Sequence, residues 1–240
     1  MMKLYSAPLS LFARKVEIAL AEKGLVEGRD YAREMVPFTQ KSGYQPKHPT
    51  VLEVNPKGQV PVLIDGDLRL YDSTLILEYL DDKFPSPPLL PPISKSGGAE
   101  ARARARQQEL YADEILFPMM RKLGYRTGPL PADPTERAAL EKTGQEAEAA
   151  IAREFAALDA QLAGRDFLWG DISLADIGLF MTMLYIRRMH GPQLDPFPAL
   201  AGWWRRLMAR PGFARAADEI AAADRAMTPA LAQYAAMRGK

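Results

Sequence analysis

The first 83 residues alternate between short apolar runs, which are typical of strands, and stretches with helical periodicity. "KLYS" predicts a brief strand, followed by an amphipathic helix that ends at Gly24. "YAREMVPF" predicts a second strand, and residues 38–55 are expected to form a loop. Val62–Ile64 and Leu68–Tyr71 predict two strands around the turn "DGD", and Ser73 begins another helix. The order β-α-β-loop-β-β-α predicts a small α/β layer.

Beyond residue 98 the chain shows helical periodicity almost throughout. Asp133 and Pro134 predict a helix start, because Asp is a preferred N-cap and Pro is favoured at the first helical position. "SLAD", residues 173–176, predicts a start of capping-box type with Asp in the reciprocal position. Helical spacing predicts two stripes of buried apolar side chains: Ile151, Phe155, Leu158 and Leu162; Ile177, Phe180, Met181 and Leu184. Two further predicted helices carry Leu75, Ile76, Tyr79 and Leu80, and Leu200, Trp204 and Leu207.

The segment "FPSPPLLPPISKSGG" contains five prolines and two glycines and separates these two patterns. Proline and glycine at this density interrupt regular structure and are typical of a linker. We therefore predict an α/β domain over residues 1–83, a Pro-rich linker over 84–98 and an all-helical domain over 99–240.

Composition narrows the possible partners and the location of the protein. Lys and Arg together exceed Asp and Glu by one charge, which gives no support to binding of nucleic acid or of an anionic membrane. No apolar run approaches the roughly 18 residues that a membrane span needs. The start "MMKLYSAPLS" reaches polar residues and a proline too early for a secretory apolar region. The sequence thus predicts a cytoplasmic protein.

The chain contains no cysteine and only two histidines, His48 and His190. Disulfides, thiolate metal sites and cysteine nucleophiles are therefore excluded. The two histidines do not have the helical spacing of a paired metal site. We expect no metal and no histidine-based triad.

One proline raises a specific question. Pro61 directly precedes the apolar run Val62–Ile64, and proline cannot donate a hydrogen bond to a strand neighbour. It can be an ordinary trans proline that begins a strand, or the Val60-Pro61 bond can be cis and present bare main chain to a ligand. An X–Pro bond is cis in only about 5% of cases in folded proteins, so the tripeptide alone favours the trans form.

Four segments together resemble the cytosolic glutathione transferases. They are "NPKGQVPVL" (55–63), "YDSTLILEYLDDKFP" (71–85), "SLADIGLF" (173–180) and "ARPGF" (209–213), in the order and approximate spacing of that family. The resemblance covers nearly the whole chain, and it is closest to serine-type, bacterial members of phi, theta or beta character. It implies a thioredoxin-like glutathione-binding domain followed by an all-helical domain, with glutathione as co-substrate and a homodimeric assembly.

The resemblance implies a role for each residue of the glutathione site. Pro61 is expected to be cis, so that the main chain of Val60 pairs with the cysteinyl backbone of glutathione like an added strand. Ser73 is expected to hold the γ-glutamyl carboxylate at a helix N-terminus, and Asp72 to face the ammonium group. Many members have Glu at the acidic position, so Asp72 is one methylene shorter. Gln59 is expected to contact the γ-glutamyl region, and Lys47 the glycyl carboxylate.

Glutathione becomes a nucleophile only as a thiolate, and a free thiol has a pKa of about 8.5. Lowering that pKa by two units requires about 2.7 kcal/mol of thiolate stabilisation. Serine-type members show the pattern S-x-x-x-R-V at the start of the first helix, and Ser10 stands before Arg14 and Val16 at nearly that spacing. We predict Ser10 as the hydrogen-bond donor to the thiolate. Ser6 and Tyr5 remain alternatives.

These residues predict a transferase that adds glutathione to a small hydrophobic electrophile. The same thiolate could serve a glutathione-dependent isomerase, or a lyase that cleaves ethers or halides. A third alternative is a non-catalytic binding or stress protein of the same fold. The lack of cysteine excludes glutaredoxin-like and omega-type reactions, because they need a protein thiol. The predicted partners are glutathione, the electrophile and a second copy of the chain.

Overall fold

The computed structural model describes residues 1–39, 41–45, 47–94 and 96–238. The chain forms two compact units. The first unit consists of Met1–Arg102 and Arg210–Ala223, and the second unit of Ala103–Ala209 and Asp224–Lys240. The sequence-based limits at residues 83 and 98 remain predictions, but the predicted fold class, an α/β part followed by helices, is confirmed.

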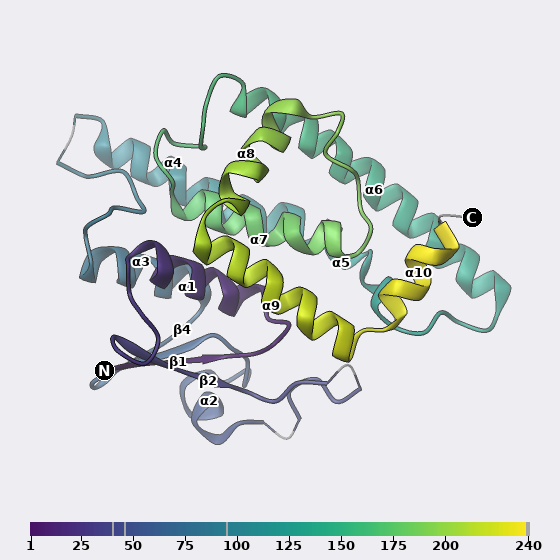
Figure 1. The fold of residues 1–240 in the computed structure, drawn as a ribbon, viewed down its shortest axis with the longest axis horizontal. Coiled ribbons are helices and arrows are strands. Elements are labelled where there is room, and N and C mark those ends of the chain that lie inside the picture. Colours follow the sequence, from purple (N-terminus) through teal and green to yellow (C-terminus); the bar gives the residue numbers. More distant parts are fainter. Residues whose placement is uncertain (40, 46, 95, 239–240) are drawn as a thin grey trace. The chain divides into compact units, whose positions relative to one another are not determined.

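The first unit contains a four-stranded mixed sheet with the order β2-β1-β3-β4. Its strands are β1 (Met2–Ser6), β2 (Tyr31–Met35), β3 (Val62–Asp65) and β4 (Leu68–Tyr71). β1 is parallel to β2 and antiparallel to β3, and β3 is antiparallel to β4. Figure 1 shows α1 (Leu11–Glu22) and α3 (Ser73–Lys83) on one face of this sheet and α2 (Pro49–Val54) on the other.

Helix α2 corrects the prediction of a loop over residues 38–55. The helix has six residues, begins at Pro49 and buries only Val51. Proline at the first helical position has a φ angle that suits a helix and an N–H that the helix would not have used. A helix with one buried residue produces no apolar periodicity, and this is why the sequence pattern did not indicate it.

The strand register places three connecting segments at one edge of the sheet, the edge where β1 and β4 end and β3 begins. Tyr5 of β1 lies opposite Val62 of β3, and Val62 lies opposite Tyr71 of β4. Because β3 runs against its two neighbours, the segment that enters β3 and the segments that leave β1 and β4 all lie at this edge. Two inter-strand spacings of about 4.8 Å place the three segments within about 10 Å along the edge.

The Pro-rich segment is attached to the first unit through Asp81, which is 4% exposed. The Asp81 carboxylate accepts hydrogen bonds from Lys23 Nζ (2.6 Å) and from the Leu89 main-chain N–H (2.6 Å). Lys23 also donates to the carbonyl oxygen of Pro87 at 2.6 Å. The Ser86-Pro87 peptide bond is cis, which the sequence analysis did not anticipate. These contacts bury Leu89 and fix the path of the predicted linker.

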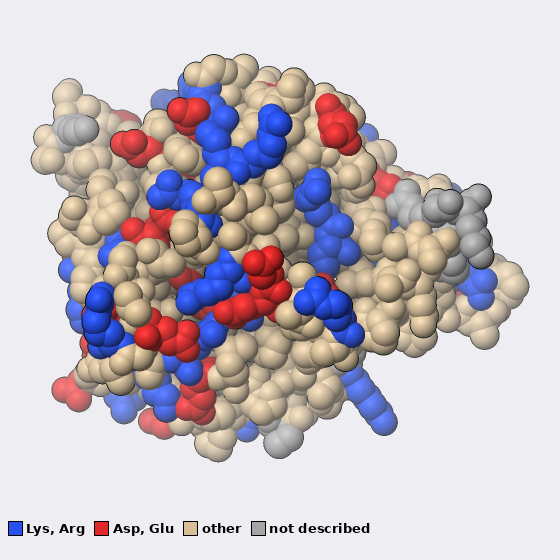
Figure 2. Space-filling model, viewed as in Figure 1, with Lys and Arg blue, Asp and Glu red and all other residues tan. Residues whose placement is uncertain are grey.

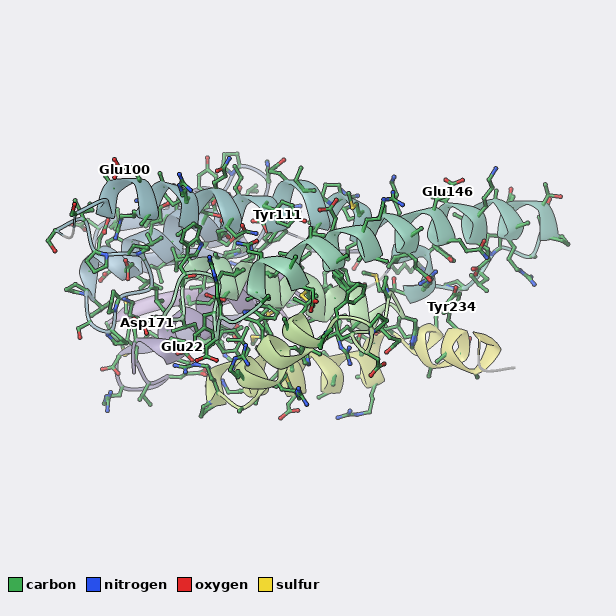
Figure 3. All side chains as sticks on the ribbon, turned by 90° about the horizontal axis from the view of Figure 1, so that it is seen from above. Glu22, Glu100, Tyr111, Glu146, Asp171 and Tyr234 are labelled. Carbon is green, nitrogen blue, oxygen red and sulfur yellow. The ribbon has the colours of Figure 1, made fainter. Side chains whose placement is uncertain are left out.

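The second unit consists mainly of helices. They are the part of α4 (Gly98–Tyr111) from Ala103 on, a π-helical turn (Ala112–Leu116), α5 (Phe117–Arg121), a 3₁₀ turn (Gly124–Thr127), α6 (Pro134–Leu162), α7 (Leu174–Arg188), α8 (Pro198–Met208), the end of α9 (Pro211–Met227) and α10 (Ala230–Arg238). Helix α10 is held by Tyr234, labelled in Figure 3, whose hydroxyl donates to Glu141 of α6 at 3.0 Å. Both predicted helix starts are confirmed: Asp133 caps α6, and Ser173 with Asp176 forms a capping box at α7.

The two predicted core stripes are buried except at Leu184, which is half-buried. Tyr79 is half-buried too, and the other two helices bury neighbours of the residues that the spacing indicated. Leu75 is 57% exposed, while Leu77 of the same helix is fully buried. Trp203 is fully buried, although the spacing had favoured Trp204. Adjacent residues on a helix point about 100° apart, so two neighbouring tryptophans fit an apolar stripe almost equally well. A hydrogen bond from Trp203 Nε1 to Asp176 Oδ1 (2.8 Å) accompanies the buried position of Trp203.

Candidate functional site

Three hydroxyl groups lie near the end of β1, and two of them are engaged elsewhere. Ser6 is fully buried, and its Oγ donates to Glu17 Oε1 at 2.5 Å. The Tyr5 ring lies 5.2 Å from the His48 ring, and its side chain interacts with Lys3. Ser10 has a different environment, at the start of α1.

Ser10 is the N-cap of α1, with extended backbone angles (φ −91°, ψ 105°). Its Oγ accepts a hydrogen bond from the Ala13 N–H at 3.1 Å, which satisfies one of the free N–H groups of the first turn. A serine hydroxyl has one proton to donate and two lone pairs that accept. After capping, the Ser10 hydroxyl has its proton and one lone pair left for a further hydrogen bond, and in this structure that bond is made with Tyr44. The side chain is 5% exposed and lies near the positive end of the helix dipole.

Tyr44, which no sequence pattern indicated, contacts several of the predicted site residues. Burial raises the pKa of Tyr44, and a hydrogen bond with the Ser10 side chain opposes that rise. The ammonium of Lys47 lies 5.7 Å from the centre of the Tyr44 ring. The ring also packs against a buried cluster that includes Val60. A single tyrosine in a stretch expected to be a loop gave no signal in the sequence.

The predicted cis bond between Val60 and Pro61 is confirmed. The side chain of Val60 is buried in the cluster that includes Ala7 and Ala13, on either side of Ser10. Among the described residues, no main-chain hydrogen bond reaches the N–H or the C=O of Val60. Buried main-chain groups nearly always have a partner, so this pair of groups is suited to bind an extended peptide.

Asn55, a further residue that no sequence pattern indicated, holds the loop that leads to Val60. Its Nδ2 donates to the carbonyl oxygen of Gln59 at 2.7 Å, and its Oδ1 accepts from the Lys57 N–H at 3.0 Å. Asn55 is 6% exposed, whereas the side chain of Gln59 is exposed. The loop thus has a fixed main chain, and the Gln59 side chain faces solvent.

Lys47 lies against the same loop. Its Nζ donates to the carbonyl oxygen of Gly58 at 3.1 Å. Gly58 has a φ of +59°, and a Cβ at this position would come within 2.7 Å of Lys47 Cδ. Glycine therefore allows both the left-handed backbone and the close approach of the lysine. An ammonium has three protons, so Lys47 can bind an anion beside the loop without losing this contact.

Asp72 and Ser73 lie at the end of β4, where α3 begins. Asp72 is the N-cap, and its Oδ1 accepts from the N–H groups of Thr74 (3.0 Å) and Leu75 (3.3 Å). Its φ of +76° is uncommon for a residue other than glycine. Such backbone strain concentrates at functional sites. Ser73 is the first residue of α3 and 4% exposed, so its N–H and hydroxyl are at the positive end of an 11-residue helix.

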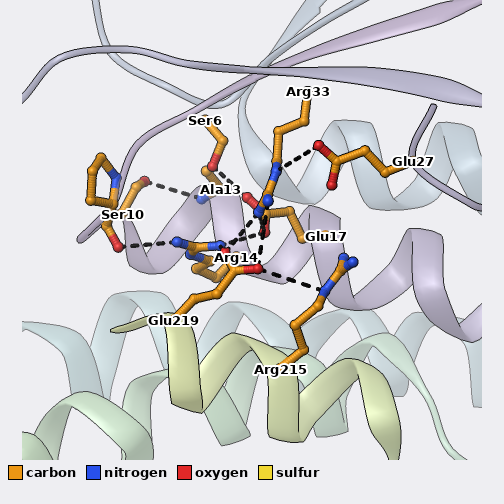
Figure 4. Close-up of polar contacts among 10 residues, drawn as sticks. Ser6, Ser10, Ala13, Arg14, Glu17, Glu27, Arg33, Arg215 and Glu219 are labelled. Carbon is orange, nitrogen blue, oxygen red and sulfur yellow. Dashed lines mark hydrogen bonds and ion pairs between the residues drawn. The ribbon is translucent and has the colours of Figure 1, made fainter. Parts of the chain in front are cut away.

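A partly buried ionic cluster lies beneath the Ser10 turn and comprises Arg14, Glu17, Arg33 and Glu219 (Figure 4). Arg14 and Glu17 are each 2% exposed, and Arg14 Nη1 lies 2.6 Å from Glu17 Oε2. Arg33 Nη1 lies 2.8 Å from both Glu17 Oε2 and Glu219 Oε2. Burial disfavours the charged form of Glu219, but Arg33 and Arg14 outweigh it and hold the pKa of that carboxyl below its usual range.

A metal site and a membrane span are both lacking in the part of the chain that the structure describes. No group of three or more His, Cys, Asp or Glu among them could hold a metal ion. No helix in the described ranges is long and apolar enough to cross a membrane. On the face shown in Figure 2, basic and acidic side chains are interspersed over the part that the structure describes.

Two family models match the chain. The model described as "Glutathione S-transferase, N-terminal domain" matches residues 4–88, and that described as "Glutathione S-transferase, C-terminal domain" matches residues 109–211. Together they cover all of the residues predicted for the site.

Two similar proteins match over nearly their whole length. Glutathione S-transferase Z2 of Arabidopsis thaliana is 32% identical over 221 residues, covering 91% of this chain and 91% of the relative. A probable maleylacetoacetate isomerase of Vibrio cholerae is 32% identical over 219 residues, covering 90% and 95%. A stringent starvation protein A homolog of Coxiella burnetii is 39% identical over 99 residues, but the match spans only 40% of this chain and 42% of that protein.

Solved structures show the same fold. Glutathione S-transferase-I bound with lactoylglutathione has a TM-score of 0.71 and 28% identity, covering 91% of this chain and 99% of the other. A glutathione transferase family member from Pseudomonas fluorescens, solved with two glutathione bound, has a TM-score of 0.68 and 25% identity, covering 90% and 92%.

Proposed function

This chain belongs to the glutathione S-transferase family, and we propose that it binds glutathione at the sheet edge of the first unit and activates its thiol through Ser10. The observation that carries the proposal is the main chain of Val60, whose N–H and C=O have no main-chain partner among the described residues. An extended tripeptide spans about 10 Å, which matches the edge formed by the segments next to β1, β3 and β4.

The two ends of glutathione have complementary groups along this edge. Ser73, with its N–H at the start of α3, is suited to the γ-glutamyl carboxylate, and the Asp72 carboxylate to the neighbouring ammonium. Both capping bonds of Asp72 end on Oδ1, which leaves Oδ2 for a ligand. Lys47 is suited to the glycyl carboxylate, and the exposed Gln59 side chain to the γ-glutamyl amide region.

The proton of Ser10 is suited to stabilise the glutathione thiolate. Oγ accepts one hydrogen bond from Ala13, and donation to sulfur leaves that bond intact. The bound sulfur would take the place of Tyr44 as hydrogen-bond partner of the Ser10 hydroxyl. Donation together with the N-terminus of a 12-residue helix favours the thiolate. Ser6 and Tyr5 are less suited, because their side chains interact with Glu17 and Lys3.

The reaction proposed is addition of this thiolate to a small hydrophobic electrophile. A second candidate is isomerisation, in which the thiolate adds to a carbon–carbon double bond and is later eliminated, so that glutathione is regenerated. The similarity to a probable maleylacetoacetate isomerase favours including it. A binding protein without turnover is the third candidate, prompted by the partial match to a stringent starvation protein A homolog.

Calorimetric titration with glutathione, followed by turnover assays, tests the proposal. We expect saturable binding of glutathione and weaker binding of cysteinylglycine, which lacks the groups assigned to Asp72 and Ser73. Conjugation of a chloronitrobenzene supports the transferase. Isomerisation of a maleyl-type substrate without consumption of glutathione supports the isomerase, and binding without turnover supports the third candidate. Absence of heat with glutathione would contradict all three.

Replacing Lys47 with methionine is expected to weaken glutathione binding about five- to tenfold, because one charge-assisted hydrogen bond is lost. The turnover number should change little, since the interaction is the same in the ground and transition states. Lys57→Met is the matched control, because Lys57 is an exposed lysine of the same loop. Equal KM values for glutathione in the two variants would remove Lys47 from the site.

We also propose that the chain forms a homodimer. Leu68, Tyr71 and Leu75 are 39%, 44% and 57% exposed on the edge strand β4 and on α3. An edge strand has unpaired main-chain groups, and exposed apolar side chains on it and on the next helix are suited to contact with a second copy. Sedimentation equilibrium of the full chain should give twice the 26.6 kDa mass of one chain.

A cytoplasmic location remains a prediction of the sequence.

A further inference from the structure

Arg14 connects the turn that carries Ser10 to a distant helix. Its guanidinium donates through Nη2 to the carbonyl oxygen of Pro8 at 3.2 Å. Through Nη1 it donates to Glu17 and to Glu219 of α9, a residue 205 positions away in the sequence. The main-chain N–H of Arg14 also donates to the Ser10 carbonyl oxygen at 3.1 Å. Figure 4 shows Arg14 between the Ser10 turn and Glu219.

The geometry of a guanidinium makes these contacts interdependent. Its donors form a rigid planar fork, so the direction of Nη2 toward Pro8 depends on where Nη1 is held. Glu17 alone is poorly suited to hold it. The Glu17 carboxylate also accepts from Ser6 and Arg33, so it is shared among three donors. Glu219 supplies the second carboxylate, which balances the charges of Arg14 and Arg33.

We propose that Glu219 is a positioning residue for Ser10, and that it acts through Arg14. It holds the guanidinium in the orientation that anchors the Pro8 carbonyl, and thereby fixes the turn in which the Ser10 hydroxyl lies. This inference rests on the proposed function of Ser10 as thiol donor. Glu219 lies outside both segments matched by the family models, which end at residues 88 and 211.

The first test is Glu219→Gln in the full chain, which keeps the shape of the side chain and removes its charge. We expect the turnover number for conjugation to fall about fivefold or more, because a small misplacement of a catalytic group is costly. The KM for glutathione should stay within about twofold, since the groups assigned to binding are untouched. Asp218→Asn, the same change at an exposed neighbour on α9, should have wild-type kinetics.

A double-mutant cycle with Ser10→Ala separates positioning from a general structural effect. If Glu219 acts through Ser10, then Glu219→Gln should cause no further loss of activity when Ser10 is already alanine. If the two substitutions instead lower the activity by independent factors that multiply in the double variant, the inference is overturned and the proposed function remains in place. A fully active Ser10→Ala variant would overturn both.

A second readout applies even where the Ser10→Ala variant is too slow to assay. The ultraviolet absorbance of bound thiolate, followed against pH, gives the pKa of the thiol in each binary complex. We expect Glu219→Gln to raise this pKa toward the value in Ser10→Ala, and Asp218→Asn to leave it unchanged. A thiol pKa in Glu219→Gln equal to that of the wild type would overturn the inference.

Discussion

Replacing Ser10 with alanine is expected to lower turnover at least tenfold while the affinity for glutathione changes little. The Ser10 proton is the group proposed to face the thiolate, and a hydrogen bond to a charged group contributes about 1.5–3 kcal/mol. Loss of about 1.4 kcal/mol of transition-state stabilisation corresponds to a tenfold lower rate. The affinity should persist, because the groups assigned to the main chain and both ends of glutathione remain.

The Ser10→Ala change also removes a helix cap, which can cost about 1 kcal/mol of stability. Ser10→Gly is the matched control, since glycine at an N-cap costs only a few tenths of a kcal/mol and also lacks the hydroxyl. Both variants should show the same low turnover number, measured with saturating glutathione. If both retain wild-type turnover, the donor is not Ser10, and Ser6→Ala and Tyr5→Phe become the next variants to assay.

The Asp176→Asn variant is expected to lose about 3–5 kcal/mol of unfolding free energy, as when one partner of a buried polar network is removed. Asp176 is fully buried, and four donors converge on its carboxylate: the Leu168 N–H (3.1 Å), the Ser173 N–H (2.9 Å), Ser173 Oγ (2.7 Å) and Trp203 Nε1 (2.8 Å). An asparagine offers one acceptor oxygen and turns an NH₂ group toward the remaining donors.

Burial raises the pKa of Asp176, and the donors from Trp203, Ser173 and Leu168 oppose that rise. Denaturant unfolding, followed by tryptophan fluorescence, measures the predicted loss. Asp195→Asn is the control, because Asp195 is an exposed carboxylate of the same unit. Equal unfolding midpoints for the Asp176 and Asp195 variants would show that the network is not needed for stability.

Elements that depend on neighbouring residues could be predicted from the sequence. The capping box at Ser173, the Asp133 cap and the strands around the "DGD" turn all follow from residue types at short fixed spacings. The family resemblance added the cis bond at Val60-Pro61, for which the tripeptide alone would have favoured the opposite geometry. Helix α2 was missed because its six residues bury a single side chain.

Contacts between distant segments could not be predicted in this way. The sequence left Ser6, Ser10 and Tyr5 as alternatives, and the tertiary structure shows Ser6 bound to Glu17. The interaction of Tyr44 with Ser10 and the link from Arg14 to Glu219 likewise join residues without a sequence pattern. Hydrogen bonds of this kind depend on side-chain direction and burial, which periodicity does not specify.

The sequence by itself determined that this chain forms an α/β layer followed by helices, and through its motifs it indicated which residues to expect around glutathione. That information is local, because caps, turns and apolar stripes arise from the backbone geometry of a few adjacent residues. Only the tertiary structure decided which hydroxyl is bound to Glu17, which tryptophan enters the core and which helix contacts Arg14 beside the Ser10 turn. Each of those outcomes depends on side chains that come into contact only when strands and helices pack, and the spacing of residues along the chain does not specify such contacts.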